Sequence, residues 1–332
     1  MPGPERVTIR RIAGELNLSS STVSRALAGR PEISPETTRR VIETARRLGY
    51  RPPPEQRTVV LILPDTDLPL GSYSIGILNG MRRECSLRGL RLESVAADHP
   101  APLEERSLYG AISFDFRQQL AFEWGRAHQL PLVCVNDMPR HLNGVYSVFT
   151  DEVQAMAEAV NHLAGFGHRR IGLLLSGAPT HTSRNRRQGF EQVMRAHGFP
   201  LEGLIVDDAL FPPPPARVDG PGGMLRKLLD AGATAIIACG EGSAAEVYFT
   251  LLRFGCPPPE KLSLIVWEQE EFCRFAIPPL TAIRQNFNLL ASKAFDLLEA
   301  IAAGEVPDGD IPIPAQLILR GSVSTPPPEM MH

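Results

Sequence analysis

Apolar residues recur with helical spacing at the start of the chain. The first series falls at intervals of three and four: Ile9, Ile12, Ala13 and Leu16. This spacing predicts a helix with one buried stripe. Thr8 stands directly before the series, where a hydroxyl can accept a hydrogen bond from a free N–H group of the first turn. We therefore predict a short helix with Thr8 as its N-cap.

A second helix is predicted after the polar turn at 17–19. Its inward positions are apolar: Val23, Ala26 and Leu27. Ser19 is suited to cap this helix, and Ser20, Ser21 and Arg25 fall on its outward face. Two helices joined by a turn of three to four residues form a helix-turn-helix, whose second helix enters the major groove of DNA.

A third helix and a proline-rich linker complete this region. Ser34 is the expected N-cap, Pro35 suits the first helical position, and Gly49 is the expected C-cap. The apolar face of the helix is formed by Val41, Ala45 and Leu48. We predict a small all-α domain over 1–51 and a short linker over 52–58, whose three prolines favour an extended backbone.

From residue 59 onward the pattern changes to alternating strands and helices. The run VVLIL at 59–63 is apolar throughout, as in a strand buried on both faces of a sheet. Further strands are expected at 91–96, 110–114, 131–135, 171–175, 203–206, 235–239, 262–266 and near 316–319. Helices are expected at 74–88, 117–128, 151–165, 184–197, 222–231, 243–254 and 286–303. This alternation predicts an α/β body with parallel sheets and helices on both faces.

The body is long enough for two lobes rather than one sheet. We place both lobes within 59–325 and expect 326–332 to form a disordered tail. No run of eighteen apolar residues exists, and the N-terminus lacks the pattern of a secretory signal. We therefore expect a cytoplasmic, nucleoid-associated protein that does not bind membranes.

Charge is distributed unevenly along the chain. Residues 1–58 contain eleven arginines, six glutamates and no other charged residue, which gives a net charge of +5. Because the whole chain carries −3, the remainder carries −8. A basic helix-turn-helix segment on an acidic body is typical of a DNA-binding head.

Motifs for catalysis, metal binding or cofactor binding are not found. The chain lacks a Gly-x-Ser-x-Gly elbow, a Walker loop and a GxGxxG turn between a strand and a helix. Its histidines show no metal-ligand spacing, and His168 is interpreted as a turn and packing residue. The five cysteines are also too widely spaced for a metal site, and we expect them to be reduced and mostly buried. We expect a protein that is not an enzyme and has no cofactor or metal.

Taken together, these motifs resemble those of the lactose-repressor (LacI/GalR) family of bacterial transcription regulators, over nearly the whole chain. The head carries VTIRRIAGELNLSSSTVSRAL followed by ISPETTRRVIETARRLGYRP, and the body carries HLAGFGHRRIGLLL (162–175), RRQGF (186–190) and PPLTAIRQNF (278–287). The resemblance implies a homodimeric regulator, acting as a repressor, on a pseudo-palindromic operator in double-stranded DNA. It also implies a body like a periplasmic binding protein, with a small effector, a sugar or another polar metabolite, in the cleft between its two lobes.

The resemblance also assigns DNA-binding roles to residues of the head. Ser20 and Ser21 match the two specificity positions that open the second helix, and Arg25 matches the arginine of a Thr-Val-Ser-Arg run. An arginine can donate two hydrogen bonds to guanine, worth about 1–3 kcal/mol of discrimination. Phosphate contacts are expected from six further hydroxyl residues: Thr8, Ser19, Thr22, Ser24, Ser34 and Thr37. The alternatives are capping alone for the hydroxyl residues and a solvated surface charge for Arg25.

The linker departs from the family pattern. Family members carry a hinge helix here that inserts leucines into the minor groove. Pro53 and Pro54 stand at its expected start, and the short remainder E-Q-R-T holds no leucine. We expect no kinking of DNA by leucine insertion. A passive tether and a phosphate or minor-groove contact by Arg51 or Arg57 stay open as alternatives.

The expected effector site departs from the family as well. Arg186 and Asn136 match ligand-contacting positions, while Gly240-Glu241 and the run 266–269 replace residues that hold sugar hydroxyls. Arg186 and Glu268 are expected to form the polar centre. The remaining candidate effector-binding residues are Tyr73, Glu241 and Trp267. The alternative is that Arg186 pairs with Glu268 across an empty cleft.

Two other functions stay open at this point. The first is a constitutive DNA-binding regulator with a degenerate cleft, which the altered cleft residues favour. The second is a solute-binding protein that does not bind DNA, which a secretory signal would have favoured.

Overall fold

The structure is a computed structural model. It describes residues 7–30, 32–50, 57–63, 71–96, 108–114, 130–137, 145–176, 180–208, 222–240, 243–267 and 270–327. The chain divides into a first unit, Met1–Pro69, Ile77–Val148 and Asn288–Ile311, and a second unit, Leu70–Gly76, Phe149–Phe287 and Pro312–His332. Outside the described residues lie Arg51, residues 52–56 of the linker predicted at 52–58, the helix predicted at 117–128 and residues 328–332 of the predicted tail.

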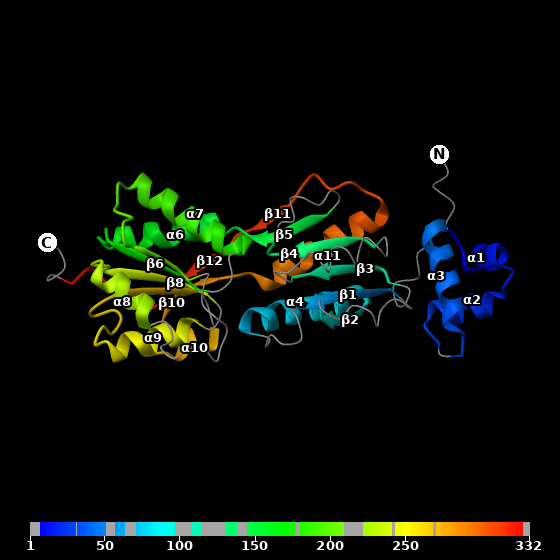
Figure 1. The fold of residues 1–332 in the computed structure, drawn as a ribbon, viewed down its shortest axis with the longest axis horizontal. Coiled ribbons are helices and arrows are strands. Elements are labelled where there is room, and N and C mark those ends of the chain that lie inside the picture. The colour runs from blue at the N-terminus through cyan, green and yellow to red at the C-terminus, as the bar shows by residue number, and fades with distance from the viewer. Residues whose placement is uncertain are drawn as a thin grey trace. The chain divides into compact units, whose positions relative to one another are not determined.

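Three helices form the N-terminal head, as the apolar spacing predicts: α1 (Ile9–Leu16), α2 (Ser20–Leu27) and α3 (Pro35–Leu48) (Figure 1). Their buried contacts come from the predicted apolar stripes: Ile12, Ala13, Val23, Ala26, Val41 and Ala45. Each helix begins at the predicted hydroxyl cap, and α3 ends at Gly49, whose φ of 73° favours glycine. The helix-turn-helix is therefore confirmed as a packed unit.

The first unit contains a six-stranded sheet in the order β11-β5-β4-β3-β1-β2. Its strands are β1 (Thr58–Leu63), β2 (Arg91–Ala96), β3 (Gly110–Ser113), β4 (Leu132–Val135), β5 (Tyr146–Thr150) and β11 (Ile311–Ile313). The pairs from β2 to β5 are all parallel. The predicted buried strand at 59–63 is thus the second strand from one edge, with four of its residues almost fully inaccessible to solvent.

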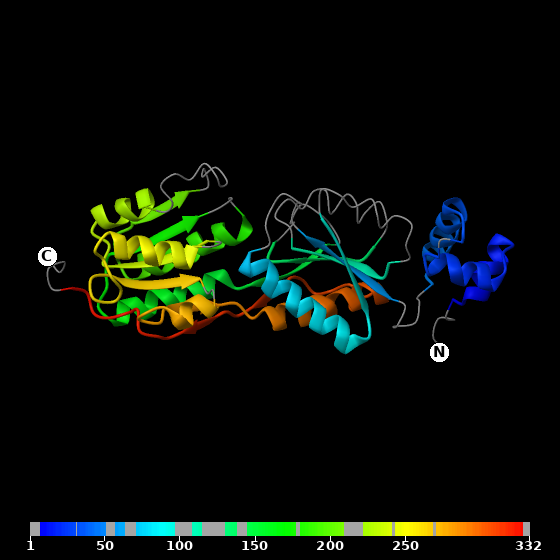
Figure 2. The same ribbon diagram turned by 90° about the horizontal axis from the view of Figure 1, so that it is seen from below.

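Helices α4 (Ser72–Arg88) and α11 (Phe287–Ala303) run beside each other along this sheet (Figures 1 and 2). Arg88 joins them, because its guanidinium bonds Glu84 on its own helix and Asp296 and Glu299 on α11. Gly110 allows α11 to approach β3 closely, since a Cβ there would lie 2.7 Å from Leu298.

The second unit repeats the same architecture with the order β12-β10-β9-β8-β6-β7. Its strands are β6 (Ile171–Ser176), β7 (Ile205–Asp208), β8 (Ala235–Cys239), β9 (Ser263–Trp267), β10 (Thr281–Arg284) and β12 (Gln316–Ile318). The strands from β7 to β10 are parallel, and β12 is antiparallel to β10. The predicted pair of parallel sheets is therefore confirmed.

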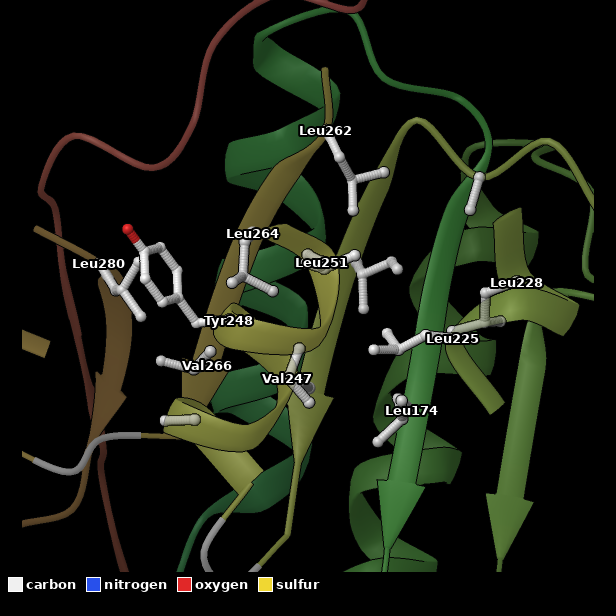
Figure 3. Close-up of a cluster of buried hydrophobic side chains, with 14 of the residues drawn as sticks. Leu174, Leu225, Leu228, Val247, Tyr248, Leu251, Leu262, Leu264, Val266 and Leu280 are labelled. Atoms are coloured by element: carbon white, nitrogen blue, oxygen red, sulfur yellow. The ribbon is translucent and has the colours of Figure 1, made fainter. Parts of the chain in front are cut away.

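Helices cover both faces of the second sheet. They are α6 (Glu152–Gly165), α7 (His181–Ala196), α8 (Gly222–Asp230), α9 (Ser243–Arg253) and α10 (Glu270–Phe275). Leu173 and Leu175 of β6 pack toward α6 and α7, whereas Leu174 packs with α8 and α9 (Figure 3). The apolar run IGLLL is thus buried on both sides, which explains why it shows no alternation.

Four short elements were not predicted: β5, β10, β11 and α10. None has more than six residues, so none shows a full hydrophobic period. Several predicted boundaries also shift. Helix α7 begins at His181 rather than at 184, because Thr180 caps it, and β7 runs over Ile205–Asp208 rather than 203–206.

His168 is fully buried, in agreement with its interpretation as a packing residue. Its Nδ1 lies 2.8 Å from the Thr234 hydroxyl, and its Nε2 lies 2.8 Å from the carbonyl oxygen of Ser324. It therefore ties the C-terminal segment to the second unit. The five cysteines are free thiols, four of them buried. Within the described residues, no helix combines the length and the apolar character needed to cross a membrane.

Candidate DNA-reading face and ligand site

The turn between α1 and α2 is held by local hydrogen bonds. Asn17 ends α1 with a left-handed φ of 54°. The Ser19 hydroxyl then accepts a hydrogen bond of 3.0 Å from the backbone N–H of Thr22, and it lies 2.8 Å from the Ser21 hydroxyl. This geometry fixes where α2 begins and which side of it faces outward.

The hydroxyl residues of the head divide into caps and outward side chains. Thr8, Ser19 and Ser34 each accept a hydrogen bond from the helix that follows, so the capping role predicted for them is confirmed. Ser20 and Ser24 are exposed on α2. Thr22 and Thr37 are half-buried, because their hydroxyls bond back to Ser19 and Ser34, respectively. Contacts of all these residues with DNA stay a prediction.

Arg25 projects from the outward face of α2. Val23 and Ala26 on the opposite face are fully buried, whereas Arg25 is exposed. Its Nε donates a 3.3 Å hydrogen bond to the carbonyl oxygen of Ser21, one turn earlier. The two terminal nitrogens have no partner among the described residues. The guanidinium is thus steered by its own helix while its donor pair stays available, which is what bidentate recognition of guanine requires.

The second unit holds a buried charge cluster around Arg186 of α7. Its Nε and Nη2 donate hydrogen bonds of 2.7 and 3.1 Å to the two carboxylate oxygens of Glu152, the first residue of α6. The guanidinium carbon also lies 3.7 Å from the centre of the Trp267 ring. Only 1% of the Glu152 side chain and 13% of the Arg186 side chain are exposed. The pair is therefore a two-pronged salt bridge removed from water.

Close packing of two helices brings this pair together. Gly189 lies one turn after Arg186, and a Cβ there would lie 2.8 Å from the Cα of Val153. Because no side chain separates α7 from α6 at this point, Arg186 reaches Glu152 directly. Cys239 and Trp267 end β8 and β9, so the cluster lies at the carboxyl ends of parallel strands, where ligands bind in α/β folds.

Burial and pairing act against each other on these groups. Burial raises the pKa of Glu152, and the charge and hydrogen bonds of Arg186 oppose that rise. Burial also lowers the pKa of Arg186, but Glu152 more than offsets this and holds that pKa above its ordinary value. Cys239 is neutral at pH 7, because burial raises its pKa to about 12. Glu152 therefore keeps a pKa above its ordinary value, while Arg186 stays protonated and bonded to both of its carboxyl oxygens.

The predicted effector residues are only partly brought together. Arg186 and Trp267 are in contact, and Tyr73 lies close enough for its phenol to influence the Arg186 charge. Tyr73 itself packs edge-on against Phe287, with ring centres 5.9 Å apart. Asn136 belongs to the first unit, where it is fully buried and has a φ of 55°. Glu241 and Glu268 lie outside the described residues. The predicted pairing of Arg186 with Glu268 therefore stays a prediction.

Glu152 was missed by the sequence analysis. It is 34 positions away from Arg186 in the chain, and it looks like an ordinary acid in the first turn of a helix. A strand ending directly before Asp151 would have been the signal, since that strand places the helix start at the carboxyl edge of a sheet. The unpredicted β5 is that strand.

Comparisons with known proteins agree with both parts of the structure. Residues 8–53 match the family model "Bacterial regulatory proteins, lacI family", and residues 160–323 match "Periplasmic binding protein-like domain". The repressor CytR of Escherichia coli K12 is 27% identical over 95% of this chain and 96% of its own length. The regulator MalR of Streptomyces coelicolor is 24% identical over 96% of this chain and 97% of its own.

Solved structures show the same fold. A complex of the transcriptional regulator CelR with cellobiose superposes with a TM-score of 0.68 at 22% identity, over 96% of this chain and all of that one. A lac repressor dimer bound to operator and the anti-inducer ONPF gives 0.66 at 19% identity, over 96% and 100%. The chain therefore combines a LacI-family helix-turn-helix head with a periplasmic-binding-protein-like body, and its relatives are LacI-family transcriptional regulators.

Proposed function

We propose that this chain is a homodimeric repressor that reads a pseudo-palindromic operator through α2. The observation that carries this proposal is the outward face of α2, where Arg25 is exposed and held by Ser21 while the opposite face is buried. The relative CytR is named a repressor, and the lac repressor was solved as a dimer on its operator. One head offers one reading helix, so a palindrome requires two copies.

Footprinting on genomic fragments tests this function. We expect protection of two inverted half-sites whose centres lie about one or two helical turns apart, at roughly 10.5 base pairs per turn. The recovered sequence also tests the linker prediction, because a strongly kinked central step would point to wedge insertion. Equal protection of all fragments would contradict sequence-specific binding.

The apolar surface of the second unit supports the dimer. Four large apolar side chains on and after α9 and α10 are exposed, by 40 to 86%: Phe249, Leu252, Phe275 and Ile277. Phe249 packs against Phe272 with ring centres 5.8 Å apart, so α9 and α10 contact each other at this exposed surface. A second copy of the chain is the occupant that we propose, because a two-fold axis would cover the same face on both subunits.

A small polar effector is proposed at the Arg186 cluster. Two donor groups there have no hydrogen-bond partner among the described residues: Nη1 of Arg186 and the buried Nε1 of Trp267. A ligand with acceptor oxygens, such as a sugar, satisfies both. A thermal-shift screen of sugars and other polar metabolites tests this, because a bound ligand stabilises by mass action.

Constitutive regulation is the second candidate function. The complete pairing of Arg186 with Glu152 favours it, because the arginine needs no ligand to be neutralised. A screen in which no compound raises the melting temperature or changes operator affinity would support the constitutive regulator over the ligand-controlled one.

A further inference from the structure

We infer that Glu152 determines the ligand class of the Arg186 site: it acts as a built-in carboxylate that admits neutral polar ligands and excludes anionic ones. This inference rests on the proposed effector role of that site.

The geometry leaves no room for a second carboxylate on the guanidinium edge that Glu152 occupies. Nε and Nη2 form the two-pronged donor pair of the arginine, and Glu152 fills both positions at 2.7 and 3.1 Å. An anionic ligand that binds side-on needs this same pair of donors. It must therefore displace Glu152 or approach end-on, through Nη1 and the second N–H of Nη2, beside the intact salt bridge.

Displacing Glu152 is strongly unfavourable. Its carboxylate is 1% exposed, and no other cation described in the structure pairs with it. A buried carboxylate that loses its only cation keeps the full desolvation cost without compensation. The closely packed α6–α7 contact at Gly189 also leaves little freedom for the first turn of α6 to withdraw.

Binding beside the intact pair is unfavourable for an anion as well. The described ionisable groups that act on the pair are Asp151, Cys239 and Tyr73. Asp151 adds a second negative charge next to Glu152, and its carboxylate accepts a hydrogen bond from the backbone N–H of Gln154 at 3.0 Å. Cys239 is neutral. An incoming anion therefore meets one cation that is already neutralised and two carboxylates that repel it.

A neutral ligand escapes both costs. Among the described residues, Nη1 of Arg186 and Nε1 of Trp267 have no hydrogen-bond partner, and the guanidinium covers one face of the indole. Hydroxyl, carbonyl or ring-nitrogen acceptors satisfy these donors without adding charge. The chemical class that fits is an uncharged compound with several acceptor atoms.

The test is anion binding to the full-length protein, with inorganic phosphate and acetate as probes and neutral monosaccharides as the comparison set. Isothermal titration at low salt should detect no phosphate or acetate binding to the wild-type protein.

Glu152→Gln keeps the shape and one acceptor but removes the charge, and it should bind phosphate at least tenfold more tightly. Glu152→Asp keeps the charge and should still exclude phosphate. A double variant, Glu152→Gln with Arg186→Met, should lose the gained affinity, which assigns it to this site rather than to the basic head.

The inference would be overturned if the wild-type protein bound phosphate or acetate and Arg186→Met abolished that binding. This comparison does not use the Glu152 variants, so it does not depend on how they fold. Unchanged phosphate affinity in a folded Glu152→Gln variant would also overturn it. The effector role fails differently. If no neutral compound binds the wild-type protein while Glu152→Gln gains phosphate, the charge exclusion stands and the proposed effector function falls.

Discussion

At the scale of single residues, the chain uses two arginines in opposite ways. Arg25 is exposed and has one bond to its own backbone, so its terminal donors stay available to a partner. Arg186 is buried and has two of its nitrogens bonded to Glu152. The same type of side chain is thus available for recognition in the head and forms a buried salt bridge in the body, and its surroundings decide between the two.

His168 leads to a prediction about acid sensitivity. Burial lowers the pKa of His168 below its ordinary value of 6.5, although the hydrogen bond to the carbonyl oxygen of Ser324 opposes this shift. The unfolded chain therefore takes up a proton more readily than the folded chain. The stability is fully present above pH 6.5, and we expect the free energy of unfolding to fall as the pH drops below that value. Denaturant titrations between pH 7.5 and 5 measure this.

The matched variants separate His168 from other groups. His168→Gln should lower the free energy of unfolding at pH 7.5 by about 1–3 kcal/mol, because its buried partners lose a hydrogen bond. It should also reduce the fall of that free energy between pH 6.5 and 5, which we call the acid limb. The pKa of His162 is also lowered by burial, so His162→Gln serves as the control and should keep the His168 part of the limb. An undiminished acid limb in His168→Gln would contradict the assignment.

Residue roles could be predicted from the sequence where the interaction is local. Thr8, Ser19 and Ser34 cap helices whose first turns follow directly, so the pattern around each was sufficient. The partner of Arg186 was not predictable in this way. Glu152 meets it only because α6 and α7 pack closely, and no local pattern carries that information.

At the scale of elements, the α6–α7 contact is the feature on which the ligand site depends. Gly189 lets α7 lie against the backbone of α6 at Val153 and against the Cβ of Met156. Arg186, three residues before Gly189, forms the salt bridge with Glu152. Phe190, directly after Gly189, packs into the apolar core. A change in the separation of these helices must therefore change both packing and the salt bridge.

Gly189→Ala is expected to destabilise the second unit. The new Cβ would lie 2.8 Å from the Cα of Val153 and 2.9 Å from its carbonyl oxygen, so backbone has to shift. Overpacking of this kind costs about 1–3 kcal/mol. Gly165→Ala in α6 is the control, because a Cβ there meets nothing within 4 Å and should leave stability equal or slightly higher. Thermal unfolding compares the two, and equal melting temperatures would contradict a tight contact.

Element prediction succeeded for long periodic segments and failed for short ones. The runs at 171–175 and 235–239 are apolar throughout and lie in central strands. Strands β10 and β11 have four and three residues, and they depend on a neighbouring strand for their hydrogen bonds. Their formation is decided by the sheet they join, which is information that the segment itself lacks.

At the scale of the whole molecule, the chain is proposed to act as a pair. The two units were expected from the length and the repeated strand–helix pattern. The sequence did not indicate that each unit is built from three separate stretches of chain. The exposed apolar side chains of α9 and α10 could not be predicted either. From sequence alone, a helix with apolar residues on two sides is interpreted as buried, because the neighbours of each side are not known.

Phe275→Glu is expected to weaken self-association. Phe275 is 76% exposed beside Ile277 on the proposed dimer face, and a carboxylate there would be desolvated in a two-fold contact. We expect the dimer dissociation constant to rise at least tenfold in sedimentation equilibrium. Val306→Glu is the control, because Val306 is 83% exposed outside this face. Equal dissociation constants for the two variants would move the interface elsewhere.

Arg25 is proposed to read bases from the outward face of α2. The most direct test is competition binding, with the recovered operator against a scrambled duplex, for the wild-type protein, Arg25→Ala and Arg40→Ala. Arg40 is also exposed in the head, on α3, so both variants lose the same charge. We expect Arg40→Ala to keep its preference for the operator, because Arg40 lies on α3 and not on the outward face of α2. Only Arg25→Ala should lose discrimination between the two duplexes, and undiminished discrimination by Arg25→Ala would contradict the account.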